Sequence, residues 1–491
     1  MKWTCLRIAL WVCALAPPGA RAAAPPTPAG AATAATAAAA AAAAPGSQAA
    51  APPASLTTAS ETDLVGPDSF YPGVLAAQYT FILQHQSALY SPYAGPLSLK
   101  PGGDTQPTNT LGIYTGWAPL TWGQLYLDVE KFMGEGVSDA TGLAGLTNDD
   151  VIRAGPSQLR KTFYIARLYA RFMWPLGGGA VRVERSQDQI AGAEAARRLE
   201  LKVGHLAAPD DFDQNRYAGS PRTQFLNGSL VNDGAWDYAR DTRGYTDGIV
   251  VGYVSPAWSL NYGIYRMPTV AEGEQLVTSL ARANGQNLQL SLTGLPTGTV
   301  VRLLGYLNTA AMGDYAAALV RAAATHALPD VAASALPGRQ KHGFGFDAEQ
   351  PLADDGDTGM FLRWGWNDGR EQSFTFTEVD EVVSTGVQIS GDEWRQPDAQ
   401  LGFGVASEAI SGPHRAYLAA GGCGFVLCDG RLNYGREQIL EAYYRLLRIW
   451  PEDPGPVRWE LGPDFQFIRN PGYNRDRGPV SFWGVRLHVD Y

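Results

Sequence analysis

The stretch from Asp210 to Tyr245 concentrates side chains that can bind hydroxyl groups. Arg offers a fork of N–H donors, Asp and Asn offer paired acceptors, and Trp and Tyr offer flat apolar faces. Such groups suit a neutral solute rich in hydroxyls, held by contacts weak enough to release it again. The alternative is a polar loop kept in shape by its own Arg–Asp pairs. The residues concerned are Asp210, Asp211, Asp213, Asn215, Arg216, Tyr217, Arg222, Asn227, Asn232, Asp233, Trp236, Asp237, Tyr238 and Arg240.

Catalytic and metal-binding motifs are absent from the sequence. No Lys follows a Gly, which rules out a phosphate loop, and neither H-E-x-x-H nor G-x-S-x-G occurs. The carboxylate pair of Asp210 and Asp211 is insufficient for a glycosidase, which needs two carboxyls across a cleft. Composition alone leaves a lipase open, since Ser, His and Asp are all present, but no spacing brings them together. The His residues stand apart at 85, 205, 326, 342, 414 and 488, so we expect no enzyme, no metal and no cofactor.

Segments of alternating polarity recur along the chain and are the elements that would position these groups. In each, apolar residues share one face of a strand and polar residues share the other. In the first example, Leu125, Leu127 and Val129 lie opposite Gln124, Tyr126, Asp128 and Glu130. In the second, one face has Tyr164, Ala166, Leu168, Ala170, Phe172 and Trp174 and the other has Arg167, Tyr169 and Arg171. In the third, one face has Trp483, Val485, Leu487, Val489 and Tyr491 and the other has Arg486, His488 and Asp490.

The number of these segments indicates the fold class. About 17 candidates of roughly ten residues each cover most of the chain, which is too many for one sandwich. No repeat of fixed period supports a propeller or solenoid. Aromatic residues at segment ends, such as Tyr164 with Trp174, suit the two interfaces of a membrane. Because strands cross a bilayer only as a closed cylinder, we predict an all-β transmembrane antiparallel barrel of about 16 strands, with 18 as the alternative, and inward-folded loops.

The interruptions between strands are informative as well. Residues 134–158, 175–189, 209–245 and 268–285 are too long for hairpin turns, so we expect loops outside the cell or inside the pore. The Ala-rich segment 313–328 has apolar residues at helical spacing and predicts a short helix in a loop.

The first residues of the chain predict export. Residues 1–22 combine a basic start, an apolar stretch and an A-x-A pattern at Ala20 to Ala22, as in a secretory signal peptide. A lipoprotein anchor at Cys13 fits less well. Residues 23–62 are rich in Ala and Pro and predict a disordered tether, and residues 63–491 form the barrel domain. The net charge of −10 makes nucleic acid an unsuitable partner.

Two cysteines, Cys423 and Cys428, remain after removal of the signal peptide. If they lie on one strand, their side chains point to opposite faces about 16 Å apart, too far for a disulfide. We therefore expect two free thiols, with a bridge possible only if the chain turns between them.

Four segments together resemble the carbohydrate-selective outer-membrane porins of the OprB type. They are LKVGHLAAPDDFDQNRYAGSPRTQFLNGSLVNDGAWDYARDTRGYTDG, YLNTAAMGDY, AISGPHRAYLAAGG and QFIRNPGYNRDRGPVSFWGVRLHVDY, and they follow one another in order from about Asp63 to Tyr491. The chain departs from the family's pattern at His205-Leu206, at Gly228 and in its long Ala-Pro segment. The resemblance implies a barrel of about 16 strands with a constriction lined by charged and aromatic groups.

The resemblance also implies where the constriction lies. Arg216 and Arg222, with Asp213 and Asn215, match the family's Asn-Arg-Tyr and Pro-Arg positions. The full set of expected solute-binding residues is Arg216, Arg222, Asp213, Asn215, Tyr217, Asn227, Trp236, Asp237, Arg167 and Arg171. Further candidates on the lumen side of the wall are Arg302, Arg363, Glu441, Arg445, Arg458 and Glu460.

Passive entry of small sugars through the bacterial outer membrane is the function that the resemblance implies. The alternative is a barrel that exports or anchors a polysaccharide. Expected partners are small carbohydrates, outer-membrane lipid and the barrel-assembly machinery, because the last strand ends on Tyr491 and resembles the assembly signal of such barrels.

Overall fold

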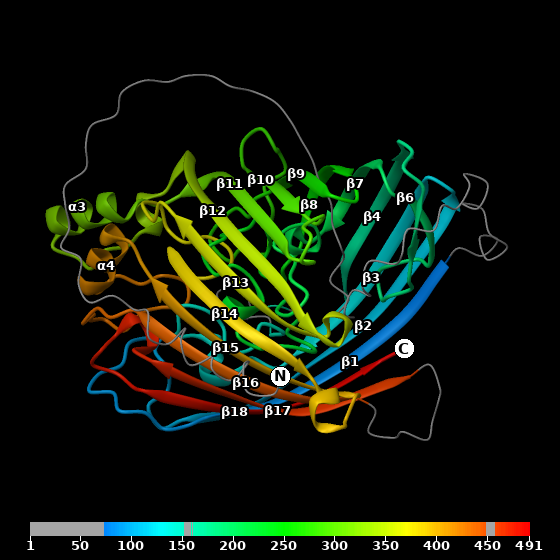
Figure 1. Cartoon of the computed structure of the whole chain (residues 1–491). Helices are drawn as coiled ribbons and strands as arrows, with labels where there is room; N and C mark the ends of the chain where they lie inside the picture. The colour runs from blue at the N-terminus through cyan, green and yellow to red at the C-terminus, as the bar shows by residue number, and fades with distance from the viewer. Residues whose placement is uncertain (1–72, 152–158, 160, 448–456) are drawn as a thin grey trace. The chain divides into compact units, whose positions relative to one another are not determined.

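The computed structural model describes residues 73–151, 159, 161–447 and 457–491, and sixteen of its strands form one closed antiparallel β-barrel (Figure 1). The predicted fold class and strand count are confirmed. The predicted signal peptide and tether lie outside the described residues. The barrel strands are β1 (Gly73–Gln86), β2 (Asp104–Leu120), β3 (Gly123–Met133), β4 (Tyr164–Pro175), β7 (Arg198–Leu206), β8 (Thr246–Val254), β9 (Trp258–Arg266), β10 (Asn284–Leu292), β11 (Val300–Met312), β12 (Leu336–Ala353), β13 (Thr358–Asn367), β14 (Glu381–Ser390), β15 (Ala399–Ala409), β16 (Glu437–Leu447), β17 (Arg458–Arg469) and β18 (Val480–Asp490).

The last strand closes the barrel. β18 pairs with β17 on one side and with β1 on the other, where Tyr79 lies opposite Val489. Every other barrel strand pairs with its two neighbours in the sheet. Closure leaves no strand edge exposed, which is the condition for a sheet to lie in lipid.

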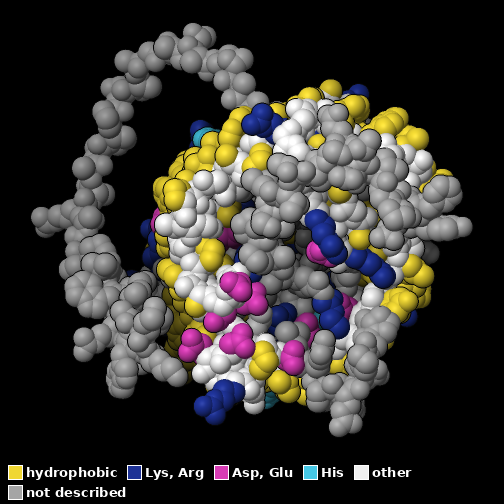
Figure 2. Space-filling view, turned by 45° about the vertical axis from the view of Figure 1, so that its right-hand side comes forward, with side chains coloured by type: hydrophobic (Ala, Val, Ile, Leu, Met, Phe, Trp, Pro, Cys, Tyr) yellow, Lys and Arg dark blue, Asp and Glu magenta, His cyan; other side chains and the backbone are white. Residues whose placement is uncertain are grey.

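Alternation along each strand separates an apolar outside from a polar inside. In β18 the side chains of Trp483 and Val485 are 58% and 47% exposed, whereas Arg486 and His488 are buried inside the barrel. The predicted faces of β3 and β18 are confirmed in this way. Figure 2 shows acidic and basic side chains gathered within the outline of the barrel and hydrophobic ones along its edges.

The predicted faces of β4 are wrong at its beginning. Between Asp128 and Val129 of β3, β4 contributes one extra residue, Ala166, in a β-bulge. The bulge moves Tyr164 from the predicted lipid face to the inside, where its hydroxyl donates to Glu130 over 3.3 Å. Tyr164 is therefore no part of an aromatic girdle. Ala166, predicted on the same outer face, is also buried inside, where it packs with Tyr245. From Arg167 onward, β4 follows the predicted alternation.

The two ends of the barrel differ in the length of their connections. The termini end carries the start of β1, the end of β18 and mostly short turns, whereas the long-loop end carries the long connections (Figure 1). Helices in those connections are α2 (Gly228–Val231), α3 (Tyr315–Thr325) and α4 (Gly412–Ala419). The predicted helix within 313–328 is confirmed as α3, which begins where the Asp314 side chain accepts a bond from the Ala317 amide. Among the described residues, no helix has both the length and the hydrophobicity to cross a bilayer.

One connection at the termini end folds inward. It contains the small hairpin of β5 (Ala180–Val183) and β6 (Gly192–Ala195), and its turn brings Asp188 to 3.7 Å from Arg167 on the inner wall. Ile190 of the same turn is buried in a hydrophobic core cluster with Tyr126. The long interruption predicted over 175–189 thus enters the barrel from the end that carries the termini.

The expectation of two free thiols is wrong. Cys423 and Cys428 form a disulfide, with their Cα atoms 4.5 Å apart. They lie in the connection between β15 and β16 and not on a strand, and the chain turns between them where the Gly424 amide donates to the Leu427 carbonyl over 2.9 Å. A turn brings side chains together that a strand would hold apart.

Candidate functional site: the lumen and its entrance

The connection between β7 and β8, residues 207–245, folds into the barrel and is called here the inner loop. Its Asn215 amide donates to Asp347 of β12 over 2.7 Å. Its backbone at Leu226 and Asn227 donates to the Glu441 carboxylate of β16, which lies across the barrel from β7. Because these partners belong to well-separated strands, the inner loop spans the lumen.

Apolar burial explains why the inner loop lies inside. Phe212 and Trp236 are fully buried and pack with Tyr265 of β9, whose ring meets that of Phe212 edge-on at 6.3 Å between centroids. A second cluster joins Phe225 to Tyr443 of β16, with centroids 5.0 Å apart. Each buried aromatic contributes about 1.5–3 kcal/mol, so the loop gains more by packing in the lumen than by extending into water.

A buried ion network fixes the middle of the inner loop. Arg363 of β13 is fully buried, and its Nε lies 3.1 Å from Asp213 Oδ1 and 3.2 Å from Asp347 Oδ2. Nearby, burial and the neighbouring Asp213 raise the pKa of Asp233 to about 8. Asp233 is therefore largely neutral at pH 7, which limits the negative charge that Arg363 has to balance.

Three cavities adjoin one another through shared lining residues. The vestibule, about 800 Å³, is lined only by connections at the long-loop end, including Pro96, Tyr315 and Phe425. The neck, about 50 Å³, shares Phe425 with the vestibule and has room for only a few water molecules. The lumen chamber, about 170 Å³, shares Phe132, Asp149, Arg240 and Arg243 with the neck.

The lumen chamber is polar and rich in both signs of charge. Its charged lining consists of Arg167, Arg222, Arg240 and Arg243 together with Glu130, Asp149, Asp150, Asp188, Asp210 and Asp213. Carboxylates therefore outnumber guanidiniums, and guanidiniums such as Arg167 and Arg222 are in direct contact with carboxylates. Such a lining presents donors and acceptors to a hydroxyl-rich solute at the same time.

Arg222 joins the inner loop to the wall of the chamber. Its Nε lies 2.8 Å from Asp150, its Nη2 lies 3.1 Å from Glu130, and its Nη1 donates to the Tyr114 hydroxyl over 2.7 Å. Both carboxylates are buried, whereas 18% of the Arg222 side chain is exposed to the cavity. Arg222 is thus held by its partners and still accessible to a solute.

Arg167 of β4 holds the start of the inner loop. It makes a two-pronged contact with Asp210, with Nε–Oδ2 and Nη2–Oδ1 distances of 2.6 and 2.8 Å. Its Nη1 lies 3.4 Å from Asp128 and 3.7 Å from Asp188. Burial raises the pKa of Asp188, although Arg167 opposes the shift. Arg167 therefore links the wall, the inner loop and the hairpin turn at the termini end.

The neck is framed by Arg240 and by carboxylates. The Arg240 guanidinium lies 5.3 Å from the centre of the Phe376 ring and 3.2 Å from Glu272. Asp149 also lines the neck, and burial raises its pKa to about 6 against the opposing effect of Arg240. The charge in the neck consequently changes just below neutral pH.

The sequence-predicted residues divide between cavity and packing. Arg167, Arg222 and Asp213 line the lumen chamber. Asp210, Asn232, Tyr238 and Arg240 of the wider Asp210–Tyr245 segment line it as well. The other residues of the expected solute-binding set line none of the three cavities. Among them, Tyr217 donates to a backbone carbonyl in the turn after β12, and Asn227 caps the start of α2.

Two further predicted residues of the inner loop are also buried. The Trp236 indole donates to Asn287 of β10 over 3.0 Å. The Asp237 carboxylate lies 3.1 Å from Lys341 Nζ, and both side chains are almost fully buried. These contacts hold the loop against the wall.

Arg216 and Arg171 form ion pairs near the termini end. Arg216 Nη2 lies 3.1 Å from Asp357, and Arg171 lies 2.5 and 2.8 Å from Glu194 and Glu200. For every predicted residue outside the cavities, a direct contact with solute stays a prediction.

Several lining residues were missed as site candidates. Glu130 was assigned correctly to the inner face of its strand but was not connected with Arg222. Asp149 and Asp150 form an acidic pair in a long interruption, a signal that was available, whereas Asp188 had no distinguishing pattern. Across the described ranges, no cluster of three or more His, Cys, Asp or Glu side chains could hold a metal ion.

A closed sixteen-stranded barrel with a loop folded into a charged lumen defines a porin. A sequence model of the family described as "Carbohydrate-selective porin, OprB family" matches residues 133–491. The chain therefore belongs to the OprB family of carbohydrate-selective porins and is a porin of the bacterial outer membrane.

One solved structure shares the fold at low sequence identity. OprB of Pseudomonas putida, in a structure titled as its high-pH form, has 14% identity and a TM-score of 0.63, covering 86% of this chain and 95% of that chain. The outer membrane channel DcaP of Acinetobacter baumannii has 10% identity and a TM-score of 0.44, covering 85% of this chain and 97% of that chain. No curated protein sequence matches the chain.

Proposed function

We propose that the protein lets small sugars diffuse passively across the outer membrane into the periplasm. In this proposal the long-loop end faces outward and the termini end faces the periplasm, the orientation usual for bacterial barrels. A solute enters the vestibule, passes the neck, which has to widen beyond the about 50 Å³ of this structure to admit a sugar, and exchanges hydrogen bonds with the wall in the lumen chamber.

The observation that carries the proposal is the paired lining of the lumen chamber. Arg222 and Arg167 each have carboxylate partners, so the chamber needs no ionic ligand to balance them. A neutral hydroxyl can accept from a guanidinium and donate to a carboxylate without displacing either charge. We propose that Arg167, Arg222 and Asp213 contact the sugar, and that the buried predicted residues position the inner loop.

Export of a polysaccharide is the weaker proposal. A polymer needs a continuous wide passage, whereas the inner loop spans the lumen from Asp347 of β12 to Glu441 of β16. No described feature favours that function.

Two further parts of the proposal concern delivery to the membrane. We propose that residues 1–22 direct export and that the β18 edge ending at Tyr491 is read by the barrel-assembly machinery. The apolar outer face, with Trp483 58% exposed, would then contact lipid.

The test is single-channel recording in planar bilayers titrated with glucose. Current interruptions whose frequency rises linearly with glucose concentration are expected from a channel that binds sugar weakly. Liposome swelling in glucose and in maltose measures the flux itself. A folded barrel that carries ions but shows neither glucose interruptions nor swelling would refute sugar diffusion.

A further inference from the structure

Phe425 occupies the passage between the outer cavity and the inner ones. Of the described residues, Phe425 alone lines both the vestibule and the neck. A solute that moves from one cavity to the other therefore passes this side chain.

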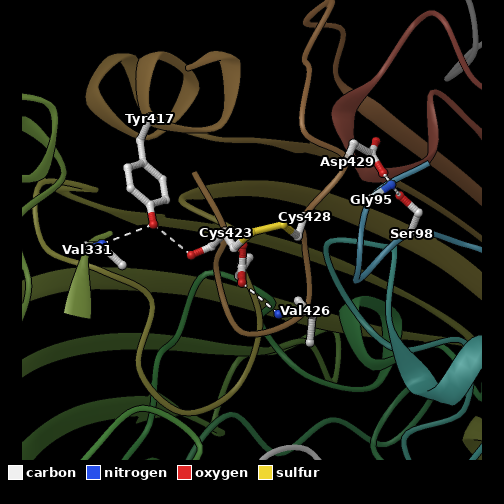
Figure 3. Close-up of a disulfide and its surroundings, with 9 residues drawn as sticks. Gly95, Ser98, Val331, Tyr417, Cys423, Val426, Cys428 and Asp429 are labelled. Carbon is white, nitrogen blue, oxygen red and sulfur yellow. Dashed lines mark hydrogen bonds between the residues drawn. A yellow bond between two sulfur atoms is a disulfide. The ribbon is translucent and has the colours of Figure 1, made fainter. Parts of the chain in front are cut away.

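The loop that carries Phe425 is anchored on several sides. The Cys423–Cys428 disulfide closes it, and the Tyr417 hydroxyl donates to the Cys423 carbonyl over 2.8 Å (Figure 3). The same hydroxyl accepts from the Val331 amide over 3.1 Å. These bonds tie the Phe425 loop to α4 and to the connection between β11 and β12.

Two more bonds fix the residue next to Phe425. The Val426 amide donates to Glu378 Oε1 over 2.8 Å, and the Val426 carbonyl accepts from the Gly142 amide over 2.8 Å. Backbone held on both sides leaves the attached segment little conformational freedom. The phenyl ring is consequently presented by a rigid support.

The rest of the neck complements an aromatic face. Arg240 and Glu272 supply donors and acceptors, while Phe132 and Phe376 supply further apolar surface. A pyranose ring has hydroxyls around its edge and an apolar C–H surface on its face. An open-chain polyol has the same hydroxyls but no such face.

We propose that Phe425 is a specificity-determining residue that stacks on the apolar face of a pyranose at the entrance to the neck. The inference rests on the proposed sugar diffusion and names its substrate class, cyclic sugars in preference to acyclic polyols of equal hydroxyl content. The disulfide serves to hold the ring in place.

The experiment compares block by glucose and by sorbitol, added from the long-loop side of single channels. The wild-type channel is expected to capture glucose faster than sorbitol. In Phe425→Ala the glucose on-rate should fall about fivefold, equivalent to ~1 kcal/mol, while the sorbitol on-rate changes little. Phe425→Trp should keep the preference for glucose because it keeps an aromatic face.

Phe425→Leu is the matched test of the ring itself, since it keeps apolar volume but removes the flat face. It should lose the preference as Phe425→Ala does, and retention of the preference would overturn the proposal. Phe403→Ala removes the same ring from the outside of β15, where 40% of it is exposed, and should behave as wild type. A difference in electrophoretic mobility between unheated and heated samples confirms that each variant is folded.

The double variant C423S/C428S tests whether the disulfide holds the Phe425 ring in place. A glucose on-rate reduced as in Phe425→Ala is expected, and a wild-type rate would overturn the role given to the disulfide. Unchanged glucose and sorbitol rates in Phe425→Ala would overturn the proposal as a whole. Absence of any sugar block in the wild-type channel would instead refute the proposed function, so the two failures are distinguishable.

Discussion

Replacing Arg222 by Ala removes a positive charge from the lumen chamber. Its two carboxylate partners, Asp150 at 2.8 Å and Glu130 at 3.1 Å, would remain buried without this cation, at a cost of about 3–5 kcal/mol. A monovalent ion passing about 5 Å away in water would feel about 0.8 kcal/mol of altered energy, favourable to cations and unfavourable to anions. The cation-over-anion permeability ratio should therefore rise roughly tenfold.

The reversal potential of single channels in a KCl gradient measures that ratio. Arg222→Lys keeps the charge but loses the fork of donors, so its reversal potential should stay near wild type while glucose block weakens about tenfold, as for one charge-assisted hydrogen bond. Arg182→Ala removes an equal charge from the hairpin at the termini end, where 77% of the side chain is exposed, and should change neither. A wild-type reversal potential in folded Arg222→Ala would refute the placement of this guanidinium in the ion path.

Three further predictions concern buried groups. Burial raises the pKa of Asp149 to about 6, so acidification from pH 7 to pH 5 should neutralise this carboxylate. The reversal potential in a KCl gradient should then shift in the direction of higher anion permeability. Asp149→Asn should abolish most of that shift. Burial raises the pKa of Asp233 from 3.8 to about 8, so the folded form binds the proton more tightly than the unfolded form. The free energy of unfolding should therefore fall as pH rises from 4 to 8. Asp233→Asn should flatten this pH dependence, measured by thermal unfolding that is followed by electrophoretic mobility. Arg363→Met should lower the unfolding free energy by about 3–5 kcal/mol, because Asp213 would stay buried without a cation, whereas Asp347 keeps Arg302 at 2.7 Å. An unchanged unfolding temperature would contradict this.

Features that depend on residues close together in the sequence could be predicted from the sequence. The alternation in Val480–Tyr491 placed Trp483 outside and Arg486 inside, because a strand has a period of two and lipid accepts only the apolar face. The same reasoning failed at Tyr164, since a bulge of one residue reverses the faces and leaves no mark in composition. The disulfide was missed for a similar reason, because its formation depends on a turn that was read as a strand.

The amino-acid sequence by itself determined the barrel, the approximate number of strands and the presence of a polar loop rich in Arg, Asp and aromatic residues. Only the tertiary structure decided which of those residues face the lumen. Asp213 meets Arg363 across 150 positions of sequence, and Arg222 meets Glu130 across 92. Local patterns carry no information about such distant pairs, because they form only when closure of the barrel brings the inner loop against its wall.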